Sequence, residues 1–224
     1  MNPRKELGHS AALGRAFHVD VFEGDRPAFA VVMIGGSGVT PDEYERRAAC
    51  VDPRFSGALA RLEREARFTF VFVCGPADGL FGRVAADPEA QAGWIEHVAT
   101  EVLPIVGGLP VYLAAHSGGA ALALGGAHEL DAVFGAGALG ADALPRDLEI
   151  PAAWADPCVT LVYNRGDGVF ARYLEVVRRL EQDHVVRCLR KLEGGHALVD
   201  YLDNESFGGL VRRAARIAGG RTPA

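Results

Sequence analysis

Short apolar runs separated by amphipathic stretches are the main pattern along this chain. A run such as Phe68–Val73 is too uniformly apolar to alternate, which predicts a strand covered on both faces. Elsewhere apolar residues recur every three or four positions, as at Leu59, Leu62 and Ala66, which predicts a helix with one buried face. The runs predict strands at 17–22, 28–34, 68–73, 111–115, 132–136, 159–163 and 185–189. Alternating strands and helices indicate right-handed crossovers and a mainly parallel sheet.

Proline and capping residues predict where the helices begin. Asp52-Pro53 and Asp87-Pro88-Glu89 each place proline at a first helical position, and Thr40-Pro41-Asp42-Glu43 adds a capping box. A last helix is expected to begin near Ser206 and to end at Gly219-Gly220. We expect residues 1–15 to be flexible. The linker 23–27 predicts a hairpin turn, so 17–22 and 28–34 would form an antiparallel edge of the sheet.

The segment Val111–Ala120 (VYLAAHSGGA) carries the strongest chemical signal. An apolar run leads to Ser117, and two glycines follow at once, which is the form of a strand, a tight turn and a helix that begins on a nucleophile. Such a turn needs small neighbours because the serine backbone is strained and closely packed. In the G-x-S-x-G pattern, Ala115 takes the place of the first glycine.

Three other polar turns follow predicted strands in the same way. The run 28–34 leads into Gly35-Gly36-Ser37-Gly38, the run 159–163 leads toward Asp167, and Val185–Leu192 leads toward His196. Open parallel sheets place their active sites at the carboxyl ends of the strands. A serine needs an adjacent base to become a nucleophile, and an acid to orient that base. The chain order serine, aspartate, histidine therefore predicts a catalytic triad.

These motifs, in this order, resemble those of the α/β-hydrolase family, and the resemblance extends from about residue 16 to residue 217. It implies the α/β-hydrolase fold: a mainly parallel sheet with an antiparallel N-terminal edge, helices on both faces, and one domain over 1–224. It implies Ser117 as nucleophile, His196 as general base and Asp167 as the acid. The backbone N–H groups of Gly36 and Gly118 would form the oxyanion hole.

Alternatives remain for the catalytic positions. Asp142, after the predicted strand 132–136, is a second candidate for the triad acid, and Asp200 is a third. Ser117, Asp167 and His196 also have structural interpretations as helix-cap or turn residues. The sequence departs from the usual family pattern at Asn164, which stands where a glycine often begins the acid turn, and at Ile34, where many members carry histidine before the glycine.

Substrate contacts are predicted in two loops. The loop 75–86 contains Asp78 and Leu80, with a solvated loop as the alternative. Ser37 is a candidate hydroxyl donor near the oxyanion hole, with a turn residue as the favoured alternative. The insertion 137–158, which contains Trp154, is expected to form a short lid. A small lid leaves an open cleft and favours a carboxylesterase or thioesterase over a lid-gated lipase.

Composition excludes several other classes. A net charge of −6 and a pI near 5.6 argue against nucleic-acid binding. No run approaches the ~20 apolar residues of a membrane span, and the polar N-terminus does not resemble a secretory signal. The four cysteines, without C-x-x-C spacing, are expected to be reduced and buried, and the chain to be cytoplasmic. Gly35–Gly38 lacks the Lys-Ser/Thr ending of a phosphate loop, and no metal-ligand spacing occurs.

The sequence thus predicts a cofactor-free serine hydrolase that cleaves an ester or a thioester through an acyl-enzyme intermediate. Its expected partner is a small-molecule acyl substrate, either free or attached to a carrier or coenzyme A. Two alternatives stay open: an acyltransferase or cyclase that uses the same triad, and a catalytically silent binding protein with this fold.

Overall fold

The computed structural model describes residues 4–34, 53–73, 88–109, 111–115, 135–139, 159–164 and 186–191, with helical residues 208–209, 211–212 and 215–216. These residues form an eight-stranded sheet in the order β1-β2-β4-β3-β5-β6-β7-β8. The bounds are β1 Arg4–Ser10, β2 Arg15–Phe22, β3 Phe29–Ile34, β4 Phe68–Val73, β5 Val111–Ala115, β6 Gly135–Leu139, β7 Val159–Asn164 and β8 Val186–Lys191. β1 and β2 are antiparallel to their neighbours, and every pairing from β4 to β8 is parallel.

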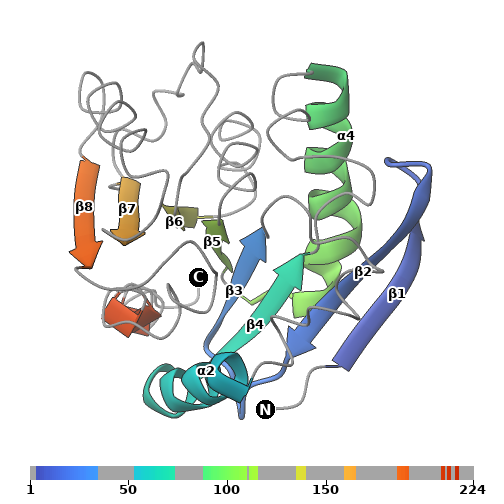
Figure 1. Ribbon diagram of the computed structural model, residues 1–224. Helices are drawn as coiled ribbons and strands as arrows, with labels where there is room; N and C mark the ends of the chain where they lie inside the picture. The colour runs from blue at the N-terminus through green and yellow to red at the C-terminus, as the bar shows by residue number, and fades with distance from the viewer. Residues whose placement is uncertain are drawn as a thin grey trace.

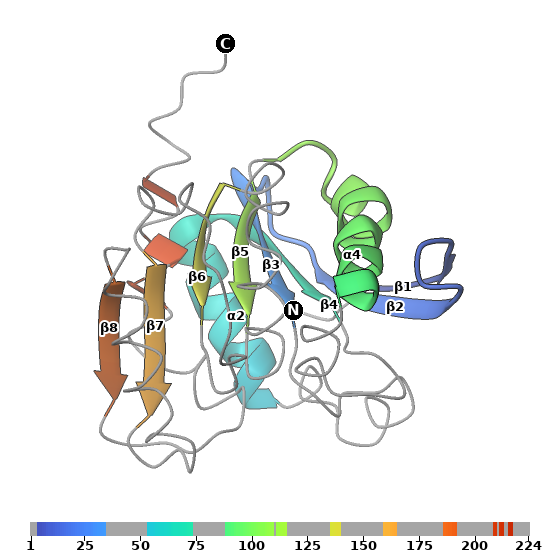
Figure 2. The same cartoon turned by 90° about the horizontal axis from the view of Figure 1, so that it is seen from above.

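Helices lie on both faces of this sheet (Figure 1 and Figure 2). On one face is α2, Pro53–Ala66, which ends where Arg67 turns into the left-handed region at φ 52°. On the other is α4, Pro88–His97, which continues as a π-helical turn, Val98–Val102, and a 3₁₀ turn, Leu103–Val106. Both helices begin at the predicted prolines. Of the helices in the described part of the chain, none is long and apolar enough to cross a membrane.

The core on the α2 face is built largely from aromatic side chains. Phe29 stacks on Phe68 at 5.7 Å between ring centroids and meets Tyr112 edge-on at 5.4 Å. Leu59 and Leu62 of α2 join the same cluster, as does Val211 from the last helical segment. Every residue of β3 and β4 is buried, which confirms for β4 the prediction of a strand covered on both faces.

The N-terminal predictions are wrong in two respects. Residues 4–10, expected to be flexible, form edge strand β1, and the predicted hairpin of 17–22 with 28–34 does not exist because β4 lies between β2 and β3. The true antiparallel edge is the β1–β2 hairpin. An edge strand buries little of itself, so RKELGHS lacks a hydrophobic signal, and Leu7 is 77% exposed. Instead the Phe17 ring covers Gly8 on the paired strand.

The predicted position of strand β6 is also wrong. The sequence predicts a strand at 132–136, whereas the structure has it at Gly135–Leu139, which shortens the lid-like insertion from 137–158 to 140–158. Pairing with β5 sets this position, because Ala114 pairs with Ala138 and Ala115 with Leu139 beyond a register shift. A short run of glycine and alanine carries no periodicity that could reveal its register in advance.

Two glycines offer a matched test of this packing. A Cβ at Gly24 would lie 2.2 Å from the Phe68 carbonyl oxygen, at the fixed start of β4, so Gly24→Ala should lower the free energy of unfolding by about 1–3 kcal/mol. A Cβ at Gly57, within α2, meets nothing within 4 Å, so Gly57→Ala should raise it by about 0.5–1 kcal/mol. Urea unfolding measures both. Equal effects of the two substitutions would contradict the described packing.

Candidate active site

The carboxyl edge of the parallel strands is the candidate site. The strands β3, β5, β7 and β8 run in one direction, and each precedes a segment of the sequence that contains a predicted functional residue. Gly36 follows the last residue of β3 by two positions, and Ser117 follows that of β5 by two. Asp167 follows β7 by three positions, and His196 follows β8 by five. The four strands that precede these residues therefore end at one edge of a single sheet.

The predicted site residues themselves lie outside the described residues. This holds for the triad and oxyanion positions, for the alternative acids Asp142 and Asp200, and for the substrate-contact candidates Ser37, Asp78, Leu80 and Trp154. The cysteine side chains and the predicted helix at 40–43 lie outside them as well. The structure thus describes the strands from which these residues follow, and their roles stay predictions.

Strand register divides the edge into two pairs of neighbours. Ile34, at the end of β3, pairs with Ala115, at the end of β5, so the oxyanion segment and the nucleophile segment leave the sheet level with each other. Asn164 and Lys191, at the ends of β7 and β8, are also paired. Through β6, Ala115 is level with Leu161, so β7 continues three residues, roughly 10 Å, beyond β5. The predicted acid and base therefore follow strands that extend farther beyond the sheet edge than β5, the strand before Ser117.

The strand ends that precede Gly36 and Ser117 rest on a closely packed base. Met33 and Ile34 of β3 are 3% and 1% exposed, and Ala114 of β5 is 4% exposed. Met33 and Ala114 belong to the aromatic cluster on the α2 face, and they pair in register. Fixed strand ends are what a catalytic geometry requires, because small displacements of reacting groups lower the rate steeply.

A cluster of titratable groups lies away from these strand ends and joins the hairpin to the helix. His97, at the end of α4, contacts Glu101 through its Nδ1, and the Glu101 Oε1 accepts the Ala11 N–H at 2.8 Å. The Ser10 side chain also bonds Glu101, and its Oγ accepts the Leu13 N–H at 3.0 Å. These contacts, which we call the hairpin clamp, fasten the β1–β2 turn to α4 and the π-helical turn.

Burial and hydrogen bonding together set the protonation of the hairpin clamp. The pKa of His97 lies below its ordinary value because desolvation disfavours the cation and the Arg15 charge adds to this, although Glu101 opposes both. Desolvation acts to raise the pKa of Glu101, but hydrogen bonds from Ser10, His97 and Ala11 outweigh it, so that pKa is lowered. At neutral pH a neutral His97 therefore donates to an ionised Glu101.

Comparison with solved structures identifies the architecture. A fluorophosphonate-binding serine hydrolase of Staphylococcus aureus, FphF, superposes with a TM-score of 0.66 over 99% of this chain and 100% of its own, at 13% identity. A ferulic acid esterase gives 0.68 over 97% and 98%, at 13% identity. A serine hydrolase without a lid from Xanthomonas campestris gives 0.58 over 100% and 98%, at 16% identity.

No family model matches the chain, and the search of curated proteins found no relative. The solved structures nevertheless match it across nearly its whole length, and they are α/β serine hydrolases and esterases. The mixed sheet with parallel core strands is the one that the motifs implied. The chain therefore has the α/β-hydrolase fold.

The hairpin clamp predicts how stability changes with pH. The pKa values of His97 and Glu101 are lower in the folded state than their ordinary values of 6.5 and 4.5, so the unfolded chain binds more protons as pH falls. The free energy of unfolding should therefore decline on acidification. The contribution of His97 is lost below about pH 6.5, and that of Glu101 is lost below about pH 4.5. One extra proton contributes at most about 1.4 kcal/mol per pH unit.

Unfolding in urea at pH 7.5, 6.5 and 5.5 measures this effect. His97→Gln should flatten the decline between pH 6.5 and 5.5, whereas the control His9→Gln, on the exposed side of β1, should leave it as in the wild type. An unchanged slope in His97→Gln would contradict the assigned protonation states.

Proposed function

We propose that this protein is a serine hydrolase that cleaves a carboxylic ester or thioester through an acyl-enzyme intermediate. The observation that carries the proposal is the shared carboxyl edge: in the sequence, Gly36, Ser117, Asp167 and His196 all follow parallel strands of one sheet. Ligand and catalytic sites of open α/β sheets lie at this edge. The solved structures that this chain resembles, among them a fluorophosphonate-binding serine hydrolase and a ferulic acid esterase, support the same chemistry.

The order of the strands supports the roles proposed for the four site residues. Gly36 and Ser117 follow β3 and β5, whose level ends are neighbours, which suits an oxyanion donor beside a nucleophile. Asp167 and His196 follow β7 and β8, also level neighbours, which suits an acid beside a base. Two strand spacings, about 10 Å, separate β5 from β7. The five residue steps from Lys191, the end of β8, to His196 can span up to about 17 Å, so the chain is long enough to bring the imidazole to Ser117.

In the proposed reaction, the Ser117 Oγ attacks the carbonyl carbon of the substrate while His196 accepts the hydroxyl proton. The N–H groups of Gly36 and Gly118 donate to the oxygen that becomes negative in the tetrahedral intermediate. The intermediate collapses, the bond to the alcohol or thiol breaks, and His196 returns the proton to that leaving group. Water then attacks the acyl-enzyme by the same steps, and Asp167 keeps the imidazole in the required tautomer.

The insertion between β6 and β7 supports a small, open cleft. It comprises only 140–158, and the X. campestris serine hydrolase to which the chain is similar is described as lacking a lid. A substrate with a bulky carrier or coenzyme A portion can reach an open cleft without a gating movement. Esters and acyl thioesters therefore belong together in the first substrate panel.

Labelling with a fluorophosphonate probe tests the nucleophile. The wild-type protein should gain one adduct by intact mass, because an activated serine attacks the phosphorus and expels fluoride. Ser117→Ala should gain none, and His196→Ala should react at least a hundredfold more slowly. The control Ser56→Ala, on α2, should label like the wild type. Full labelling of folded Ser117→Ala would assign the reactive serine elsewhere.

Substitution of each candidate acid identifies the third triad member. Asp167→Asn should lower kcat for ester hydrolysis by about 10³–10⁴-fold, because the amide favours the wrong tautomer of the base. Asp142→Asn and Asp200→Asn should each change kcat by less than about tenfold and serve as matched controls. A large loss in Asp142→Asn with activity retained in Asp167→Asn would move the acid to the strand after the nucleophile.

A further inference from the structure

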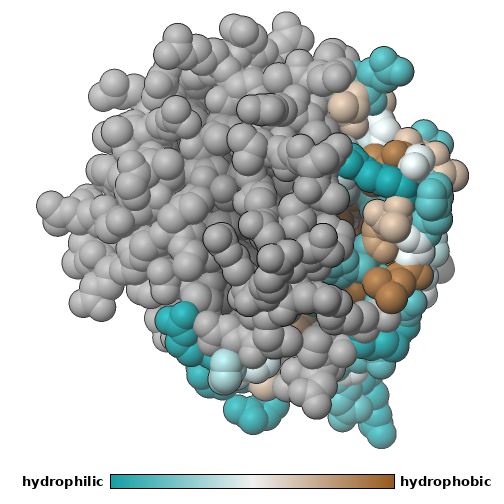
Figure 3. Space-filling view, turned by 45° about the vertical axis from the view of Figure 1, so that its right-hand side comes forward, coloured by the Kyte–Doolittle hydropathy of each residue, from teal (hydrophilic) through white to brown (hydrophobic). Residues whose placement is uncertain are grey.

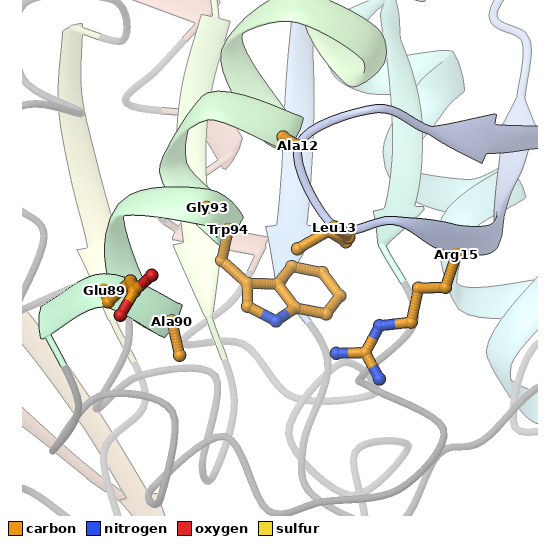
Figure 4. A pocket seen from close by; sticks show the side chains of 7 residues that line it. All are labelled: Ala12, Leu13, Arg15, Glu89, Ala90, Gly93 and Trp94. Atoms are coloured by element: carbon orange, nitrogen blue, oxygen red, sulfur yellow. The ribbon is translucent and has the colours of Figure 1, made fainter.

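The tip of the β1–β2 hairpin projects beyond the strand that supports it. Val19 of β2 pairs with Val73, the last residue of β4, so residues 15–18 continue past the end of β4 by about 13 Å. The tip therefore lies beside α4 rather than on the parallel strands, as Figure 4 shows. We call residues 10–17 the strap, because they cross from β1 to β2 over the side of this helix.

The strap buries little apolar surface against the helix. Residues 11–17 are all exposed or half-buried, and hydrophilic and hydrophobic residues are mixed on the described surface of this side of the molecule (Figure 3). A Cβ at Gly93 would lie 3.4 Å from the Ala12 carbonyl oxygen, but a pocket of about 340 Å³ separates other parts of the strap from the first turns of α4. Segments with few buried apolar contacts open locally at low free energy.

The hairpin clamp supplies a polar attachment for the strap. The Glu101 Oε1 accepts the Ala11 N–H at 2.8 Å, and the Ser10 side chain bonds the same carboxylate. The other oxygen of that carboxylate, Oε2, contacts the Nδ1 of His97. One carboxylate therefore joins the strap to a buried imidazole, so a change in the charge of the imidazole acts directly on this attachment.

The surroundings of His97 suit a neutral imidazole. Its ring is 1% exposed, and the rings of Phe17 and Trp94 meet it edge-on, with centroids at 4.5 and 5.4 Å. A neutral ring satisfies Glu101 with the single N–H on Nδ1, whereas the cation carries a second N–H on Nε2 that needs an acceptor. Phe17 belongs to the strap, so separation of the strap from α4 uncovers the ring and admits water to this nitrogen.

Two charged groups of the described residues act on His97. Glu101 of the π-helical turn attracts a proton to the ring, and Arg15 of the strap repels it. The other titratable groups on these elements are paired with Arg4, exposed on α4, or on the opposite face of the sheet from Phe17: respectively Glu6; Glu89 and Glu96; and His9, His18 and Asp20. The balance on His97 is therefore set by one attraction, one repulsion and the loss of hydration.

We propose that the strap is released by acid: when a proton binds His97, residues 10–17 separate from α4 while the sheet core stays folded. Burial and Arg15 outweigh the attraction of Glu101, so the pKa of His97 lies below 6.5 while the strap is closed. In the released form water reaches the ring, its pKa returns toward 6.5, and the released form binds more protons below that pH. Acid therefore favours release, by at most about tenfold in the equilibrium constant per pH unit. The release does not depend on the proposed catalysis.

Hydrogen exchange of the Ala11 amide measures release, because Glu101 accepts this N–H only while the strap is closed. The protection factor of Ala11, the intrinsic exchange rate divided by the measured rate, should fall by about threefold to tenfold between pH 7.5 and 5.5. The fall should level off at the pH where the His97 ring itself titrates, as followed by NMR. Urea at 1 M should leave Ala11 protection unchanged, since local opening exposes little surface. The protection of β3 and β4 should be larger and should decrease with urea.

Two matched variants assign the effect to His97. His97→Gln keeps an N–H for Glu101 and cannot become charged, so its Ala11 protection should be independent of pH, whereas the control His9→Gln, on the exposed side of β1, should respond like the wild type. The proposal is overturned if wild-type Ala11 protection does not depend on pH, or if it falls equally in His97→Gln. It is also overturned if Ala11 has the same protection and urea dependence as β3 and β4. The first and third outcomes need only the wild-type protein, so they decide the proposal even where His97→Gln does not fold.

Discussion

Burial of β3 and β4 on both faces is the constraint on which the rest of the structure depends. Every side chain of these two adjacent strands is excluded from water, so each must be covered by helices above and below the sheet. Parallel pairing fixes their register, since a shift by one residue would turn every side chain to the opposite face. The strand ends, and with them the starting points of the polar turns, follow from this packing. The site edge is therefore a consequence of core formation.

The second organising contact is the hairpin clamp. Glu101 lies in a π-helical turn, a feature that often marks functional positions, and its carboxylate satisfies a backbone N–H of the hairpin turn as well as the buried His97. This contact ties the antiparallel edge to the parallel core across a long interval of sequence.

Sequence reasoning succeeded where hydrophobic burial decides the structure. The central strands, the starts of α2 and α4 at Pro53 and Pro88, and the fold could all be predicted, because apolar runs and proline report burial and chain geometry directly. The motif order around Ser117 predicted the type of fold that the structural neighbours share.

The predictions failed where pairing decides the structure instead. The strand β1 is polar and half-exposed, and it exists because it pairs with β2, with the Phe17 ring over Gly8. The position of β6 is set by its register with β5, which no local pattern in GAGAL encodes. The hairpin clamp was missed for the same reason, since it needs the β1–β2 hairpin that the sequence did not reveal. Glu101 four residues after His97 was the one local signal, a helical i,i+4 pair.

The most direct measurement of the central claim is a crystal structure of the fluorophosphonate-treated protein. The tetrahedral phosphonate stands in for the intermediate of acyl transfer. We expect a covalent bond from the Ser117 Oγ to phosphorus, the phosphoryl oxygen within about 3 Å of the Gly36 and Gly118 nitrogens, and His196 between Ser117 and Asp167. A phosphonate attached to another residue, or to Ser117 with His196 directed away from it, would contradict the account.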